Sequence, residues 1–103
     1  MIFYLSGKIS DVTKSKEREN MEVFNAAERD LVARGVTVFN PAKLECDGKP
    51  WEWYLARDLK WINDYRPMLY MLPGWQDSRG SRLEVAFAQL LGLQILYPIG
   101  RTE

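Results

Sequence analysis

The chain has 103 residues, 47% of them apolar and 27% charged, as expected for one globular domain with a buried core. Its formal net charge is zero, so a basic surface wide enough to bind duplex nucleic acid is not expected. Histidine is absent, which removes the commonest metal ligand and the commonest general base, and no metal site is predicted.

No apolar run approaches the roughly 20 residues of a membrane span, and no signal peptide is recognisable, so no membrane partner is expected. The single cysteine, Cys46, excludes an internal disulfide and suits a reducing compartment. These features predict a cytoplasmic protein. Any acid–base chemistry falls to carboxylates, tyrosine, lysine or Cys46.

Apolar runs alternate with helical patterns along the whole chain. In chain order we predict a strand at residues 2–5, a helix that is capped by Thr13 or Ser15 and ends at residue 34, a strand at 36–39, a loop at 42–49, a helix at 50–64, a strand at 68–72, a helix at 78–91 and a strand at 94–97. Strands separated by helices imply a parallel sheet with right-handed crossovers. We therefore predict a single α/β domain over residues 1–103, a three-layer flavodoxin- or Rossmann-like fold with a four-stranded parallel sheet in the order 2-1-3-4 and helices on both faces.

Polar residues follow three of the predicted strands: Ser6-Gly7-Lys8, Asn40-Pro41 and Asp77-Ser78-Arg79-Gly80-Ser81. In the order 2-1-3-4 the first and third of these loops face each other across the crevice beyond the strand ends. The third loop offers a hydroxyl at a helix N-cap, a glycine, free helix amides and arginine charge, which suit a phosphate or a sugar hydroxyl. In the alternative, Ser78 only caps its helix and the arginines are solvated.

Two predicted helices carry a carboxylate on an otherwise apolar face. Asp58 lies on an aromatic stripe, and Glu84 is the only acid in a helix otherwise fit for burial. A buried, unpaired carboxylate is costly, so such residues are usually paired, protonated or functional. The alternatives are structural pairings: Glu84 with Arg82, Arg79 or Lys8, and Asp58 with Tyr65 or a tryptophan indole. The tryptophan group Trp51, Trp53 and Trp61 is more typical of a core or an interface than of a wall that stacks on a base.

These residues together resemble the nucleoside 2-deoxyribosyltransferase superfamily, and within it the small branch common in phages and prophages. The resemblance covers about residues 2–97, through the segments YLSGKIS, LVARGVTVFNP, WEWYLARDL and LPGWQDSRGSRLEVAFAQLLGL. Its most specific element is Ser78-x-Gly80-x-x-x-Glu84, because relatives carry Asp or Ser, then Gly, then Glu at this spacing.

The resemblance implies an N-glycosidase or deoxyribosyltransferase that acts on a nucleoside or a nucleoside 5′-monophosphate without a metal or other cofactor. In that mechanism Glu84 attacks C1′ of the sugar, Asp58 protonates or orients the leaving base, and Tyr4 orients Glu84. The expected substrate contacts are Ser6, Gly7, Lys8, Ile9, Asp77, Ser78, Arg79, Gly80 and Ser81. Serine rather than aspartate at position 78 slightly favours a nucleotide, and a homo-oligomer is also implied.

Two other classes of function stay open. The chain could be a non-catalytic nucleotide-binding or sensing protein that keeps the same pocket. It could also be a small structural or interaction subunit that uses its tryptophans as a contact face.

Overall fold

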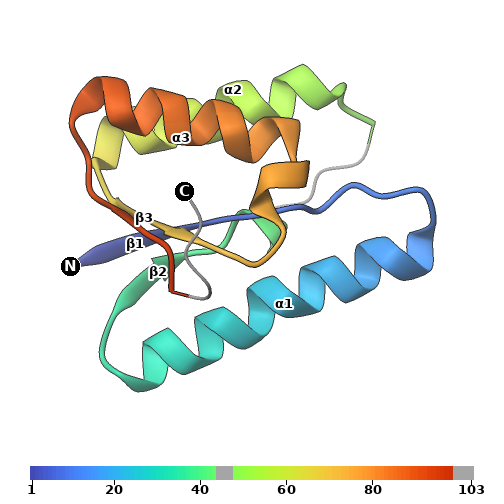
Figure 1. Cartoon of the computed structure of the whole chain (residues 1–103), viewed down its shortest axis with the longest axis horizontal. Helices are drawn as coiled ribbons and strands as arrows, with labels where there is room; N and C mark the ends of the chain where they lie inside the picture. The colour runs from blue at the N-terminus through green and yellow to red at the C-terminus, as the bar shows by residue number, and fades with distance from the viewer. Residues whose placement is uncertain (44–47, 99–103) are drawn as a thin grey trace.

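The computed structural model describes residues 1–43 and 48–98, which form a parallel sheet covered by helices on both faces (Figure 1). The strands are β1 (Ile2–Ser6), β2 (Thr37–Phe39), β3 (Met68–Met71) and β4 (Ile95–Leu96). The helices are α1 (Lys14–Ala33), α2 (Trp51–Tyr65) and α3 (Arg79–Leu91), with short 3₁₀ helices η1 (Pro41–Lys43) and η2 (Trp75–Asp77). The four strands pair in the order β2-β1-β3-β4, so the predicted α/β architecture and strand order are confirmed. Residues 44–47 of the predicted loop at 42–49, including Cys46, lie outside the described residues, and residues 42–43 belong to η1 instead of a loop.

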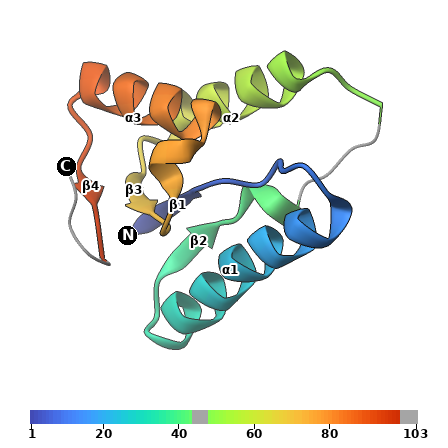
Figure 2. The same ribbon diagram turned by 45° about the vertical axis from the view of Figure 1, so that its right-hand side comes forward.

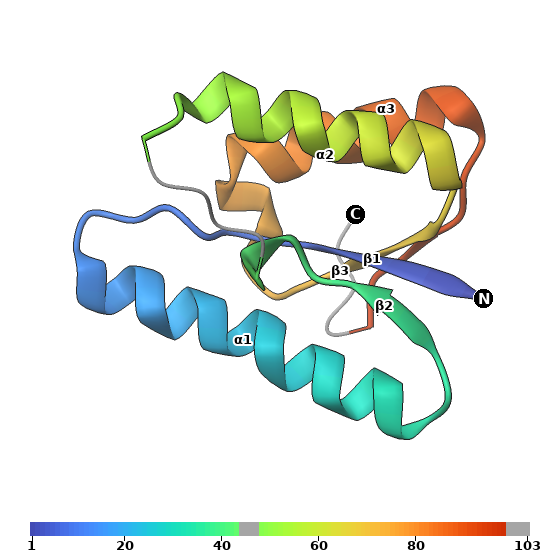
Figure 3. The same cartoon turned by 180° about the vertical axis from the view of Figure 1, so that it is seen from behind.

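Alternate residues of the central strand β1 face the two helical layers. Phe3 and Leu5 pack with Phe24 and Leu31 of α1 on one side of the sheet. Tyr4 packs on the other side, in a cluster with Leu69 and Met71 of β3, Ile62 of α2, and Val85 and Ala88 of α3. Figures 2 and 3 show α1 alone on one face and the α2–α3 pair on the other. The period of two in a strand therefore decides which β1 side chains meet α3.

All three helices begin at the edge of the sheet where the strands end, because each helix runs antiparallel to the strands it connects (Figure 1). Thr13 caps α1 by accepting a hydrogen bond from the Lys16 amide at 3.1 Å. Of the two predicted caps, Thr13 and Ser15, the first is therefore confirmed. Pro50 precedes the first turn of α2 in an extended conformation. Ser78 caps α3. Three helix N-termini and the ends of β1 and β3 are thereby gathered at one edge.

Two further predictions are corrected by the structure. No helix was predicted between the strand at 68–72 and residue 78, but Trp75–Asp77 form η2, which Gly74 starts with a φ of 82°. The predicted helix at 78–91 is confirmed as α3, with Ser78 as its N-cap. The fourth strand has two residues instead of four, because at the sheet edge it pairs with β3 alone, over Leu69–Tyr70.

The outer surfaces of the helices are mostly polar, although Leu83 and Leu90 of α3 are exposed. α1, the longest helix at 20 residues, buries only Phe24 and Leu31, and most of its early charged residues are exposed, whereas Glu17 is half-buried. Within residues 1–43 and 48–98 no helix combines the length and the apolar character needed to cross a membrane.

Candidate functional site

A cavity of about 480 Å³ lies at the edge where the helices begin, within the size range of small-molecule sites. Its walls come from the loop after β1, the first turns of α2, and the η2–α3 junction. The lining residues from the loop after β1 are Gly7, Lys8, Ile9 and Ser10; those from α2 are Trp51, Tyr54, Leu55, Arg57 and Asp58; and those from the η2–α3 junction and α3 are Asp77, Ser78, Arg79, Gly80, Ser81 and Glu84. The predicted meeting of the loops after the first and third strands is confirmed.

Glu84 lies in the second turn of α3 with only 7% of its surface exposed. Its Oε2 accepts a hydrogen bond from the Tyr4 hydroxyl at 2.8 Å, and its Oε1 accepts one from the Ser6 hydroxyl at 2.7 Å. None of the ion pairs among the described residues includes Glu84. The alternative of a helix-edge glutamate paired with arginine or lysine is therefore wrong. Neutral hydroxyls of β1 hold the carboxylate instead.

Burial raises the pKa of Glu84 to about 8, since an ionised carboxylate loses its hydration there. The Ser6 hydrogen bond lowers this pKa, the nearby Asp58 raises it, and Tyr4 and Arg57 lower it by smaller amounts. The pKa of Tyr4 is raised well above 10, first by burial and then by the charges of Glu84 and Asp58. Tyr4 is thus a constant hydrogen-bond donor, whereas Glu84 can change its charge near neutral pH.

Asp58 reaches the same cavity from α2 and is 8% exposed. Its Oδ1 accepts hydrogen bonds from Nε and Nη2 of Arg57 at 3.0 and 2.9 Å, so the structural pairings expected for it, with Tyr65 or an indole, are replaced by one with its neighbour. Burial raises the pKa of Asp58, and Arg57 opposes this. Because both carboxylates raise the pKa of Tyr4, the three groups form one electrostatic cluster.

Tyr4 and Ser6 lie behind Glu84 instead of lining the cavity. Both are almost fully buried, at 0% and 1% exposure. Tyr4 contacts Glu84 through its hydroxyl, as an orienting residue would have to do. Ser6, expected as a substrate contact, instead touches Glu84 and Ser81. Glu84 and Ser81 therefore line the cavity, whereas Tyr4 and Ser6 lie behind them and hold them in place.

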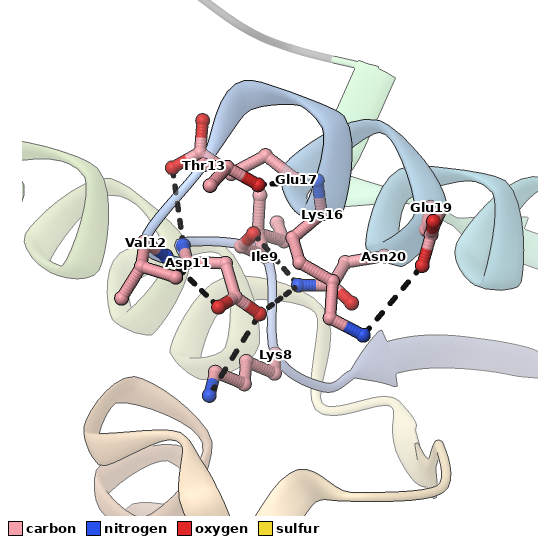
Figure 4. A network of polar contacts seen from close by, with 9 residues as sticks. All are labelled: Lys8, Ile9, Asp11, Val12, Thr13, Lys16, Glu17, Glu19 and Asn20. Atoms are coloured by element: carbon pink, nitrogen blue, oxygen red, sulfur yellow. Dashed lines mark hydrogen bonds and ion pairs between the residues drawn. The ribbon is translucent and has the colours of Figure 1, made fainter.

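A polar network holds the cavity loop after β1 against the start of α1 (Figure 4). The Asp11 carboxylate accepts hydrogen bonds from the Val12 amide at 2.8 Å and from Asn20 Nδ2 at 3.1 Å. Asn20 Nδ2 also contacts the Ile9 carbonyl at 3.1 Å, and Glu17 accepts from the Asp11 amide at 3.1 Å. The loop is therefore an ordered wall of the cavity. Lys8, 3.9 Å from Asp11, reaches the cavity from this wall.

Gly7 allows this loop to pass close to the end of β3. A Cβ at position 7 would lie 3.0 Å from Leu72 Cβ and 3.2 Å from Leu72 Cδ1. We expect Gly7→Ala to lower the free energy of unfolding by about 1–3 kcal/mol through overpacking, as measured by urea denaturation. Gly80→Ala is the matched control, because its Cβ would meet Trp51 at an ordinary 3.7 Å. Equal effects of the two substitutions would contradict this account.

The first turn of α3 leaves two backbone donors at the cavity. Ser78 Oγ accepts from the Ser81 amide at 3.1 Å, and the Ser78 carbonyl accepts from the Arg82 amide at 3.0 Å. The amides of Arg79 and Gly80 have no hydrogen-bond acceptor within the described part of the chain. Ser78 does cap its helix, as the alternative held, and its neighbouring amides are still free to bind an anion.

The two arginines of this turn are not simply solvated. The Arg79 guanidinium stacks over the Trp51 ring at 4.7 Å. Arg82 donates to the Gln76 carbonyl at 2.6 Å, which ties η2 to α3. Arg79 therefore belongs to the cavity wall, whereas Arg82 stabilises the turn outside it.

The tryptophans of α2 separate into different environments. Trp51 lines the cavity beside Tyr54, Trp53 is 40% exposed, and Trp61 stacks on Phe39 of β2 at 3.9 Å. One role was predicted for the whole tryptophan group, but only Trp61, which is partly buried, packs against the core. The helical spacing of Trp51, Tyr54 and Asp58 places these three lining residues on one face of α2. No such pattern in the sequence pointed to Arg57, a further lining residue of this helix.

The polar position after the second strand serves the fold. Asn40 Nδ2 donates to Asn25 at 3.1 Å and to Glu28 at 3.0 Å, and its Oδ1 accepts from the Ala42 amide at 3.0 Å. Asn40 is thereby committed to packing β2 against α1. Only its successor, Pro41, borders the cavity.

Comparison with known proteins adds one family. A family model described as a domain of unknown function, DUF4406, matches residues 1–97. No curated protein matches the chain, and no solved structure does. Across residues 1–43 and 48–98, no group of three or more His, Cys, Asp or Glu side chains could hold a metal ion.

Proposed function

The chain belongs to the DUF4406 family, and we propose that it is an N-glycosidase or deoxyribosyltransferase acting on a nucleoside or a nucleoside 5′-monophosphate. The observation that carries this proposal is Glu84, a buried carboxylate that opens on a cavity and is held by two hydroxyl donors. A second buried carboxylate, Asp58, lines the same cavity. Two carboxylates in different environments at one cavity suit glycosyl transfer, which needs a nucleophile and an acid.

In the proposed reaction the ionised Glu84 attacks C1′ of the sugar. A bond forms between its carboxylate oxygen and C1′, the glycosidic C–N bond breaks, and the electron pair stays on the base nitrogen. Protonated Asp58 supplies the proton that the leaving base takes up. Water or a second base then attacks C1′, gives its proton to Asp58 and releases Glu84, which makes the outcome hydrolysis or transfer.

The environments of the two acids support these roles. Tyr4 and Ser6 donate to the carboxylate oxygens of Glu84 and so fix its orientation for attack. Burial raises the pKa of Asp58, which increases the protonated fraction that an acid needs. Because the pKa of Glu84 is about 8, the attacking form is the minor one at pH 7 and the major one at pH 9.

The cavity wall supports an anionic substrate with an aromatic base. Lys8, Arg57 and Arg79 line it, and two unpaired amides point from the start of α3. A phosphate is well bound by such amides together with arginine. Trp51 and Tyr54 offer ring faces for a base. These groups favour the 5′-monophosphate over the free nucleoside.

The test is to incubate the protein with a panel of 2′-deoxynucleosides and their 5′-monophosphates and to follow free base by chromatography. We expect base release from at least one monophosphate, with a rate that passes through a maximum as the pH rises, because the reaction needs Glu84 ionised and Asp58 protonated. The incubations are made at pH 7 and at pH 9. Each incubation is repeated with a second free base, so that transfer is distinguished from hydrolysis. Absence of base release from every compound at both values of pH would overturn the enzymatic proposal.

A second candidate is a non-catalytic nucleotide-binding or sensing protein. It is favoured by the proton that Glu84 holds at neutral pH, since a neutral carboxyl group is a poor nucleophile but a good hydrogen-bond donor. Calorimetry that finds a tight complex with a deoxynucleoside monophosphate, together with no turnover, would favour this candidate.

The proposed assembly is a homo-oligomer. Leu83 and Leu90 on α3 are 40% and 79% exposed, and contact with a second copy would remove this apolar surface from water. A purely structural role for the tryptophans fits less well, because Trp61 is stacked in the core and Trp51 lines the cavity.

A further inference from the structure

A continuous line of hydroxyl groups connects the buried carboxylate to the cavity wall. Ser6 Oγ lies 2.7 Å from Glu84 Oε1 and 3.0 Å from Ser81 Oγ. Tyr4 closes the other end of the line at Glu84 Oε2. Ser6 and Ser81 are 1% and 2% exposed, and only Ser81 lines the cavity.

The single proton of the Ser6 hydroxyl cannot serve both of its contacts at once. When Glu84 is ionised, its Oε1 has no proton, so Ser6 must donate to it. Ser6 can then contact Ser81 only as an acceptor, and Ser81 spends its own proton on that bond. In this state Ser81 offers only lone pairs to a ligand in the cavity.

Protonation of Glu84 reverses the donor and acceptor roles along this line of hydroxyl groups. The new proton on Oε1 is donated to Ser6 Oγ, and Ser6 turns its own proton toward Ser81 Oγ. The Tyr4 bond to Oε2 is unchanged, and all three contacts are kept. The Ser81 hydroxyl keeps its proton but no longer donates it to Ser6, so it can donate to a ligand in the cavity. One proton added at the carboxylate therefore appears as one additional donor at the cavity wall.

We propose that Ser6 is a positioning residue that transmits the charge state of Glu84 to the hydroxyl of Ser81 at the cavity wall. A ligand oxygen beside Ser81, such as one of a phosphate or a sugar hydroxyl, is bound best while Glu84 carries its proton. The same line gives the buried carboxylate a path along which that proton leaves for the cavity. This inference rests on the proposed function only in naming Glu84 as the reacting group.

Other charged groups around Glu84 act on its titration without entering the line. Asp58 raises the pKa of Glu84, and Arg57 lowers it. The remaining charged residues of the cavity wall are Lys8, Asp77 and Arg79. None of these five donates to or accepts from Ser6 or Ser81 within the described residues. A change confined to the Ser6 hydroxyl therefore leaves their charges in place.

The test is a nuclear magnetic resonance titration of the full chain, labelled with ¹³C, from pH 5.5 to pH 10. It follows Glu84 Cδ and Ser81 Cβ, with the Glu84 signal assigned by its loss in Glu84→Gln. In the unaltered protein we expect both signals to titrate with one midpoint near 8. In Ser6→Ala we expect the Glu84 midpoint to rise by about one unit and Ser81 to stop following it, because the ionised form loses a donor.

Ser10→Ala is the matched control, since it removes a hydroxyl from the same cavity that makes no contact with Glu84. It should leave both titrations unchanged. If Ser6→Ala does not fold, Ser81→Ala replaces it, and a rise of about half a unit in the Glu84 midpoint is expected from loss of the cooperative donor. An unchanged Glu84 midpoint, or a Ser81 signal that still follows it without Ser6, overturns the proposal. Base release is measured separately, so a failure of the enzymatic function leaves this result intact.

Discussion

Glu84→Gln is expected to lower base release by at least about 1,000-fold, because removal of a nucleophile typically costs several powers of ten in rate. Glutamine keeps the size of the side chain and an acceptor for the Tyr4 hydroxyl, but its amide cannot form the bond to C1′. The measurement is the initial rate of base release from the best substrate, at the pH where the unaltered protein is fastest. Binding of that substrate, followed by calorimetry, should be retained within about 10-fold.

Two further variants make this result specific. Asp58→Asn should lower the rate by about 100-fold, the usual contribution of a general acid, and less than the loss at Glu84. Glu52→Gln is the control, because it makes the same chemical change on an exposed part of α2. It should leave the rate unchanged. Base release by Glu84→Gln equal to that of the unaltered protein would exclude Glu84 as the nucleophile.

The second large effect concerns stability and pH. Folding raises the pKa of Glu84 from 4.5 to about 8, so between these values the folded state holds a proton that the unfolded state has lost. The contribution of this group to the free energy of unfolding is therefore greatest below pH 4.5 and falls as the pH rises toward 8. A shift of this size corresponds to a loss of up to about 5 kcal/mol across the interval.

Glu84→Gln removes the titrating group and should abolish that loss. We expect the variant to become progressively more stable than the unaltered protein as the pH rises from 5 to 8, measured by urea denaturation at each pH. Measurements stop at pH 9, below the ordinary pKa of tyrosine, so that Tyr4 does not contribute. Because the charge of Asp58 interacts with that of Glu84, the same comparison is repeated in an Asp58→Asn background, where only Glu84 differs between the two proteins. Parallel stability curves for the two proteins would show that Glu84 is ionised throughout.

Local sequence was sufficient to predict the layers of this fold. The short apolar runs of the strands and the period of three to four in the helices depend on neighbours only a few residues away, and both are visible in the chain. Thr13 and Ser78 were recognisable as caps for the same reason, since a cap acts on amides two or three residues ahead. The boundaries of η2 and β4 were missed, because they depend on pairing and packing beyond the local pattern.

The anomaly at Glu84 was also visible in the sequence, as one acid among apolar neighbours. Its partners were not, because Tyr4 and Ser6 are 80 and 78 residues away along the chain. That contact requires β1 to lie under α3 with its even-numbered side chains facing the helix, which the order β2-β1-β3-β4 and the sheet register decide. Asp58 reaches the same cavity only because α2 packs beside α3.

The sequence by itself therefore determined which residues are chemically unusual, and the tertiary structure decided which of them meet. Burial supplies the physical link between the two, since a carboxylate changes its pKa only when packing from several elements removes its water. For Glu84 that packing comes from β1, α2 and α3 together. Because of the same packing, Ser6 donates a hydrogen bond to the carboxylate instead of lining the cavity as a substrate contact. Trp51 lines the cavity, whereas Trp61 of the same helix stacks on Phe39.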